Sequence, residues 1–361
     1  MVGVSIVPAR RKDLPEFIEF SWSIYANDPL WIPPLRESLV QEISGLSAVS
    51  CRWHIQPFLY KSNGVVRGRI AALINPKLVD HNGIPIGQLG YFESVDDPDV
   101  AEALVDAGTE WLREQGVRDV LAPCNGGAHR LYRLLVRGFE KTPFLFEPRN
   151  PPYYPRLLEH CRFEPRGRWF SYDLTLQEMR GILERLRSIL AKRPPRGKIV
   201  PLPPDRKQET SARVHAILDE CWSGHISYAP MELDEMTEMF SGLLSIMGPY
   251  DLTMFVQDHR DVGFGFMYPD YAAQVRALAG NTARWGEWLG KSRATRLILS
   301  TSALVPKARK SSTAVAQIAG PLDRRIQEGF QEFVVALVIE GWLSRLAKPT
   351  REYVLYGRSL G

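Results

Sequence analysis

The sequence contains few cysteines and no long apolar run. Its four cysteines are far apart and no pair has metal-ligand spacing, so the sequence predicts neither a disulfide framework nor a metal site. No uninterrupted apolar run is long enough to cross a bilayer. Residues 1–14 lack the apolar stretch of a signal peptide and instead begin as a β-strand. We therefore expect a cytoplasmic protein without a membrane span.

The length and the charge favour a two-domain protein with an anionic ligand. The chain has 361 residues, which is too many for one small domain. Apolar residues make up 45% and charged residues 24%, as in folded globular proteins. A net charge of +4 suits an anionic ligand but does not by itself indicate nucleic acid.

Residues 1–195 have the strand and helix order of one α+β domain. An apolar strand, the turn Asn63-Gly64 and a returning strand predict a β-hairpin, which a third strand follows. Asp97 and the proline after it begin a helix, and a buried strand follows. We expect a further helix roughly over residues 128–136.

Residues 196–361 repeat this plan, so a domain boundary is predicted near residue 195. Residues 252–268 form a second apolar hairpin that, like the first, has a glycine-bearing return strand and a terminal proline. A long polar and aromatic loop follows at 271–295. We expect a helix over 340–346 and a last strand over 351–356.

The stretch 296–317 has the pattern of an anion-binding loop. A strand ends at Val305-Pro306, a basic loop with Arg309 follows, and small residues precede a helix. Free N–H groups and the dipole at a helix N-terminus bind phosphate, and small side chains allow its close approach. The matching position in the first half, residues 93–98, is acidic and would repel a diphosphate. We therefore expect a cofactor loop in the second half only.

These features resemble a bacterial family of tandem-GNAT, acyl-CoA N-acyltransferase-like proteins that includes the bacterial ceramide synthases. The marks of the first half are Tyr25, Asp28-Pro29, Trp31 to Leu35, Gly68 to Ala72, Gly90 to Glu93, Pro123, Asn125, Gly138-Phe139 and Tyr153-Tyr154. The second half matches the family's acyl-CoA loop at Arg309 and Ala314, with Ser312 where glycine is usual. An asparagine expected after the next strand is replaced near residues 339–341.

The resemblance implies two tandem GNAT-like domains with a mixed sheet and acyl-CoA or acetyl-CoA as donor. The residues that it assigns to the cofactor are Leu304, Val305, Arg309, Lys310, Ser311, Ser312, Thr313 and Ala314. In GNAT chemistry an amine attacks the thioester, so a base and an acid are required. The candidates are Glu232, His225 and Tyr268, although Glu232 also fits a helix cap and His225 a structural role.

The function expected is transfer of an acyl group to a small-molecule amine, for which a hydrophobic or long-chain amine is the candidate. One alternative is an aminoacyl-tRNA-dependent transferase, for which Arg130, Arg133 and Arg137 would form a basic helix face. The other is a binding protein without catalysis, motivated by Ser312. A nucleophilic thiol at Cys124 beside His129 is a weaker hypothesis, because no acid is found to orient the histidine.

Overall fold

The computed structural model describes residues 3–244, 247–281, 283–284, 294–310, 312–340 and 347–361. The first part of the chain forms β1 (Val4–Pro8), β2 (His54–Ser62), β3 (Val65–Val79), β4 (Pro85–Ser94), β5 (Asp119–Ala122), β6 (Leu134–Arg137) and β7 (Glu164–Thr175). The later part forms β8 (Lys198–Pro201), β9 (Leu252–Gln257), β10 (Arg260–Pro269), β11 (Arg296–Leu304), β12 (Glu332–Ile339) and β13 (Arg351–Ser359).

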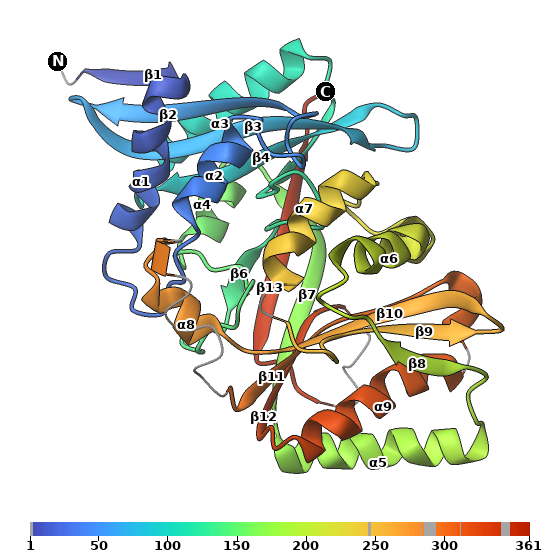
Figure 1. Ribbon diagram of the computed structural model, residues 1–361. Helices are drawn as coiled ribbons and strands as arrows, with labels where there is room; N and C mark the ends of the chain where they lie inside the picture. Colours follow the sequence, from blue (N-terminus) through green and yellow to red (C-terminus); the bar gives the residue numbers. More distant parts are fainter. Residues whose placement is uncertain (1–2, 245–246, 282, 285–293, 311, 341–346) are drawn as a thin grey trace.

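Within the described residues, these strands form one 13-stranded sheet that runs through the whole molecule (Figure 1). The strand order is β1-β2-β3-β4-β5-β13-β7-β12-β11-β10-β9-β8, and β6 pairs with β13. We call β1–β6 with their helices the first lobe, and β8–β12 with theirs the second lobe. β7 and β13 lie side by side between the lobes.

The last strand crosses the boundary that the sequence suggests. β13 pairs antiparallel with β5 and with β7, and β7 also pairs with β12. β13 is buried on both faces, with Tyr353, Val354, Leu355 and Tyr356 all in the core. The two halves therefore exchange strands in the middle of the sheet, and the division at 195/196 stays a prediction.

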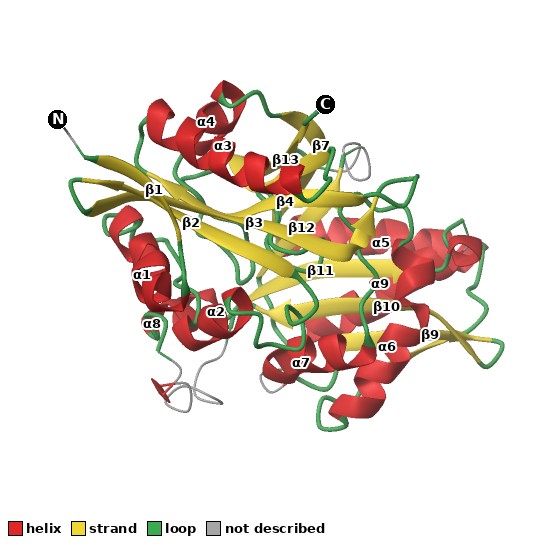
Figure 2. Cartoon of the chain, turned by 90° about the horizontal axis from the view of Figure 1, so that it is seen from above, coloured by secondary structure: helices red, strands yellow, loops and turns green. Residues whose placement is uncertain are grey.

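Helices cover both faces of each lobe (Figure 2). The first lobe has α1 (Leu14–Ile24) and α2 (Arg36–Ile43) on one face, with α3 (Pro98–Glu114) and α4 (Tyr154–His160) on the other. The second lobe has α6 (Lys207–Trp222) and α7 (Leu233–Leu244) on one face, with α5 (Leu176–Lys192) and α9 (Ser312–Gln327) on the other. The short α8 (Ala272–Ala277) follows β10. None of the helices in the described part of the chain has the length and apolar character needed to cross a bilayer.

Several local predictions are confirmed. The hairpin turn has Asn63 at φ 51° and Gly64 at φ 78°, as an Asn-Gly turn requires. The α3 helix begins where Asp97 accepts a hydrogen bond from the Asp99 N–H, at 3.0 Å. The predicted helix over 340–346 lies, beyond its first residue, outside the described residues, as does most of the stretch 282–293.

The helix predicted over residues 128–136 is wrong. Gly126 and Gly127 have φ values of 94° and 137°, and the following backbone stays irregular until β6. The side chain of Asn150 then holds Leu135: its Oδ1 accepts from the Leu135 N–H at 2.7 Å and its Nδ2 donates to the Leu135 carbonyl at 3.1 Å. The basic helix face expected for a tRNA-dependent enzyme is therefore not formed by residues 130–137.

Candidate functional site

The sheet opens between β11 and β12. These parallel strands pair only over Arg296–Leu299 and Glu332–Val335. Beyond that point β11 has a bulge at Ser300, because Thr301 pairs with Phe266 while Leu299 pairs with the next residue of β10. The β12 strand also changes direction: Leu337 has φ 55°, which is rare for a leucine. The carboxyl ends of the two strands diverge, which leaves a gap in the sheet.

A large cavity of about 1500 Å³ passes through this gap. It exceeds the roughly 300–1,000 Å³ of pockets for drug-sized ligands. Its walls are mostly apolar and come from both faces of the second lobe. On the α5 and α9 side they include Met179, Ile182, Ile318 and Leu322; on the α6 and α7 side they include Leu218, Met236, Met239 and Phe240. A chain-like ligand could thus run through the sheet rather than lie along one face.

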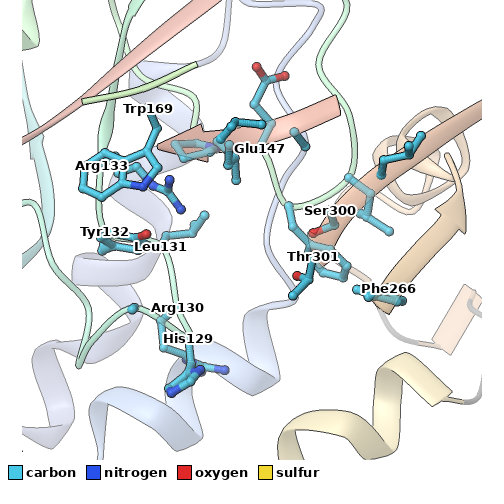
Figure 3. A pocket seen from close by; sticks show the side chains of 18 of the residues that line it. His129, Arg130, Leu131, Tyr132, Arg133, Glu147, Trp169, Phe266, Ser300 and Thr301 are labelled. Atoms are coloured by element: carbon cyan, nitrogen blue, oxygen red, sulfur yellow. The ribbon is translucent and has the colours of Figure 1, made fainter. Parts of the chain in front are cut away.

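Residues 129–133 of the first lobe form another wall of the cavity. Figure 3 shows His129, Arg130, Leu131, Tyr132 and Arg133 across the cavity from Ser300, Thr301 and Phe266. This segment is held against the second lobe, because the Ala128 N–H donates to the Ser227 carbonyl at 2.8 Å. The cavity is therefore built by both lobes, and the bulge of β11 faces the first lobe.

The start of α9 lies at the cavity, where Ala314 contributes to its lining. The first N–H groups of a helix have no partner within it. The first turn of α9 contains no acidic residue, whereas the first turn of α3 contains Asp99 and is capped by Asp97. Since a helix N-terminus favours negative charge, α9 is better suited to an anion than α3.

The loop between β11 and α9 is tied to its surroundings by Arg309. This side chain lines the cavity, and its Nε donates to the Leu304 carbonyl at 3.0 Å while Nη2 donates to the Cys221 carbonyl at 2.7 Å. Two donors of the guanidinium are thus used to join β11 to α6. Leu304 and Val305 are 7% exposed and pack in the core of the second lobe.

The remaining residues assigned to the cofactor lie at the start of α9. Lys310 is exposed. The Ser312 hydroxyl donates to the Pro194 carbonyl at 3.2 Å, and Thr313 is 1% exposed. Ser311 lies outside the described residues. This side of the loop therefore offers small side chains and backbone groups, with one lysine, to a ligand.

Two neighbouring strands of the first lobe also diverge, but residues of the same lobe fill the opening between them. β4 and β5 pair only at Gly87 and Gln88 of β4, beyond which they separate. Next to this opening, the Cys124 N–H donates to the Leu89 carbonyl at 3.0 Å. The Tyr91 N–H donates to Asn125 Oδ1 at 2.9 Å. Backbone groups of β4 that a ligand would need are thus already bonded.

Cys124 is not placed for nucleophilic chemistry. Its thiol is fully buried and donates to Gln88 Oε1 at 3.3 Å. Burial raises its pKa to about 12, so the thiolate is scarce at neutral pH. Among the described residues, no group of three or more His, Cys, Asp or Glu side chains is arranged to hold a metal ion.

The structure brings one of the three catalytic candidates to the cavity. Glu232 is exposed, precedes α7 and pairs with Lys77 at 2.6 Å, a hydrogen bond that lowers its pKa. Tyr268 is buried, its hydroxyl donates to the Leu145 carbonyl at 2.7 Å, and burial raises its pKa well above the ordinary value. Neither is among the residues that line the cavity.

His225 lines the cavity and has an unprotonated nitrogen available. Its Nδ1 lies 2.7 Å from the Ile226 carbonyl, which can only accept, so Nδ1 carries the proton and Nε2 the lone pair. Its ring lies 5.2 Å from that of Trp222 and 6.1 Å from that of Trp169. Burial lowers its pKa, so the ring is neutral at pH 7.

Two charged residues of the cavity, Glu147 and Arg133, could not be identified as site residues from the sequence around them. Glu147 accepts hydrogen bonds from the Phe144 N–H at 3.1 Å and from the Tyr353 hydroxyl. It also forms an ion pair with Arg351, whose Nε lies 3.0 Å from Glu147 Oε1. Burial raises the pKa of Glu147 to about 7 although Arg351 opposes this shift. Arg133 is stacked on aromatic rings, a placement that depends on the irregular backbone after Gly127.

Comparison with known proteins gives the fold and two relatives. No protein-family model matches the chain. Over 153 residues, 42% of the chain, it is 32% identical to Protein YghO of Escherichia coli strain K12, and the match spans only 39% of that protein. Over 292 residues it is 24% identical to the bacterial ceramide synthase of Caulobacter vibrioides, covering 78% of this chain and 74% of that protein.

A solved tandem GNAT protein from the clavulanic acid biosynthesis pathway is similar over the whole length. It superposes with a TM-score of 0.55 and 11% sequence identity, covering 99% of both chains. At this identity the likeness establishes the fold, in which two GNAT units share one long mixed sheet. The chain therefore has the tandem GNAT fold that its sequence motifs indicate.

Proposed function

We propose that this chain is an N-acyltransferase that takes its acyl group from acyl-CoA or acetyl-CoA in the second lobe. The observation that carries the proposal is the gap between β11 and β12, which leads from the start of α9 into an apolar cavity. The corresponding opening of the first lobe is closed by residues 124–125. The similarity to a bacterial ceramide synthase supports an acyl transfer reaction.

In this proposal the donor lies along β11. N–H groups at the start of α9, Ser312 to Ala314, bind the diphosphate. The pantetheine follows the diverging end of β11, and the thioester lies near the bulge at Ser300. Lys310 adds a positive charge at the solvent side. Arg309 acts by positioning the loop, because its Nε and Nη2 are bonded to carbonyl oxygens.

The acceptor amine attacks the thioester carbonyl from the first-lobe side. The C–N bond forms, the C–S bond breaks, and the leaving thiolate takes up a proton. His225 is the base in this proposal, because its Nε2 is unprotonated and can accept the proton of the ammonium directly or through water. The apolar walls formed by α5, α6, α7 and α9 hold long acyl or alkyl chains, so we propose a hydrophobic amine as acceptor.

A pair of charge variants tests the site of the donor. Ser312→Asp places a carboxylate in the first turn of α9, where it repels a diphosphate and also caps the helix. We expect the affinity for CoA, measured by calorimetry, to fall about tenfold or more, which is about 1.4 kcal/mol. Ser312→Gly, which restores the residue usual in this loop, retains or improves the affinity.

The matched control is Asp99→Asn at the start of α3, which removes a carboxylate from the corresponding place in the first lobe. It leaves CoA affinity unchanged if the donor binds in the second lobe. An effect of Asp99→Asn without an effect of Ser312→Asp would place the donor in the first lobe. Binding of CoA without turnover of any amine would favour a binding protein, and a response only to charged tRNA would favour the tRNA-dependent alternative.

A further inference from the structure

Arg133 differs from every other arginine of the cavity. The arginines that line it are Arg69, Arg130, Arg133, Arg149 and Arg309. Three of the others pair with carboxylates of the first lobe: Arg69 with Glu93, Arg130 with Glu42, and Arg149 with Asp28. Arg309 donates to two carbonyl oxygens. Arg133 makes no hydrogen bond or ion pair with any residue in the described part of the chain, and its Nε and Nη1 are buried without a partner.

Two aromatic rings hold the guanidinium in place. Its central carbon lies 4.0 Å from the centre of the Tyr132 ring and 4.6 Å from that of Trp169. Such cation–π contacts attract the guanidinium to the faces of the rings but leave its N–H groups unbonded. A desolvated charge without a partner costs several kcal/mol. The described part of the chain therefore positions a cation at the cavity without supplying its counter-ion.

The geometry points to an anionic group of the acceptor as this counter-ion. We propose that Arg133 binds a compact oxyanion, a carboxylate or a phosphate, carried by the amine that the enzyme acylates. This inference rests on the proposed function, and it narrows the acceptor from a hydrophobic amine to a hydrophobic amine with an acidic group. A guanidinium suits this role because its planar fork matches two oxygens of a carboxylate or phosphate.

The position of Arg133 assigns the oxyanion to the acceptor rather than to the donor. In the proposed function the phosphates of CoA lie at the start of α9, which follows Arg309 in the chain. Arg133 faces Ser300 and Thr301 across the cavity, where the thioester and the amine would meet (Figure 3). His225 lies beside it, with its ring 6.1 Å from that of Trp169 and 6.4 Å from that of Tyr132. An acceptor held by Arg133 would thus present its amine close to the proposed base.

The test compares binding of three long-chain amines to the full-length protein without a donor. 2-Aminopalmitate carries a carboxylate, an O-phosphorylated long-chain amino alcohol carries a phosphate, and pentadecylamine carries neither. We expect the wild-type protein to bind at least one of the acidic amines ten or more times more tightly than pentadecylamine. The better of the two identifies the oxyanion. Equal affinities, including no measurable binding of all three, overturn the proposal.

Substitutions then assign the preference to Arg133. Arg133→Met abolishes it, and Arg133→Lys, which keeps the charge but loses the fork, retains part of it. The matched control is Arg137→Met, an exposed arginine of the same segment that pairs with Glu352 and does not line the cavity. It leaves the preference unchanged. A preference that survives in Arg133→Met would also overturn the proposal.

A stability measurement separates ligand binding from a structural role. Because Arg133 has no counter-ion among the residues that the structure describes, Arg133→Met leaves the midpoint of urea unfolding unchanged or raises it. A structural arginine would lower that midpoint. In turnover assays the variant raises KM for the acidic amine while KM for the donor stays the same. A failure of the proposed function is distinguishable from a failure of this inference. If the proposed function is wrong, the wild-type protein does not bind CoA, whereas CoA binding remains if only the role of Arg133 is wrong.

Discussion

His129 makes the joint between the lobes sensitive to pH. Its ring lies 5.3 Å from that of Trp222 and 5.2 Å from that of Tyr228, and its Nε2 is buried without a partner. Burial lowers its pKa from about 6.5 to about 4. The unfolded chain therefore binds more protons than the folded protein between these two pH values. The free energy of unfolding accordingly falls as the pH is lowered through this range.

The size of this effect follows from the pKa difference. One pKa unit corresponds to about 1.36 kcal/mol, so the full loss, which is approached below pH 4, is about 3.4 kcal/mol. At pH 5.5, which is milder for the rest of the protein, the loss is about 1.4 kcal/mol. His129→Phe keeps an aromatic ring against Trp222 and Tyr228 but cannot be protonated. The free energy of unfolding of His129→Phe minus that of the wild type should therefore rise by about 1.4 kcal/mol when the pH is lowered from 7.5 to 5.5.

Urea unfolding of both proteins at the two pH values measures this change. The contributions of the other six histidines cancel in the comparison, because both proteins contain them. The control is His81→Phe, which makes the same replacement at an exposed histidine outside the joint between the lobes. A difference between wild type and His129→Phe that does not depend on pH would refute the reasoning. It would mean that residues 126–133 are not packed on the second lobe, and the placement of Arg133 would fail with it.

Two further predictions concern the chemistry of the cavity. His225→Gln should lower kcat about a hundredfold and remove the acid limb of the pH profile of kcat. In the wild type this limb lies below pH 6.5, because burial lowers the pKa of His225. A mutant profile with the wild-type shape would exclude His225 as the base. Cys124→Ala should keep kcat within about twofold of the wild-type value, since the buried thiol of Cys124 has a pKa of about 12. If the variant unfolds at the same urea concentration as the wild type but has lost turnover, the nucleophile hypothesis is restored.

Much of the fold could be predicted because its signals are local. The bounds of α5 agree with its 3.6-residue apolar pattern, and Thr175 and Glu178 form its capping box. The turn at Asn63-Gly64 depends on two residues that adopt positive φ readily. The acidic start of α3 and the small residues at the start of α9 distinguish the two lobes from sequence alone. Each of these features is decided by neighbours within a few residues.

The errors concern features that depend on distant residues. The helix predicted over 128–136 fails because Asn150, far along the chain, bonds the backbone of Leu135. The place of β13 between β5 and β7 depends on pairing across the whole chain. The ion pair of Glu232 with Lys77 of the first lobe also depends on distant residues, and the role of Glu232 as a base stays a prediction. The unpaired state of Arg133 is likewise a property of the assembled cavity and has no local sequence signal.

The most direct measurement of the central claim is a crystal structure of the protein with a thioether analogue of a long-chain acyl-CoA. We expect the diphosphate at the N–H groups of Ser312 to Ala314 and the sulfur near the bulge at Ser300. The acyl chain should extend through the gap between β11 and β12. An analogue bound between β4 and β5, or on the surface away from this gap, would contradict the account.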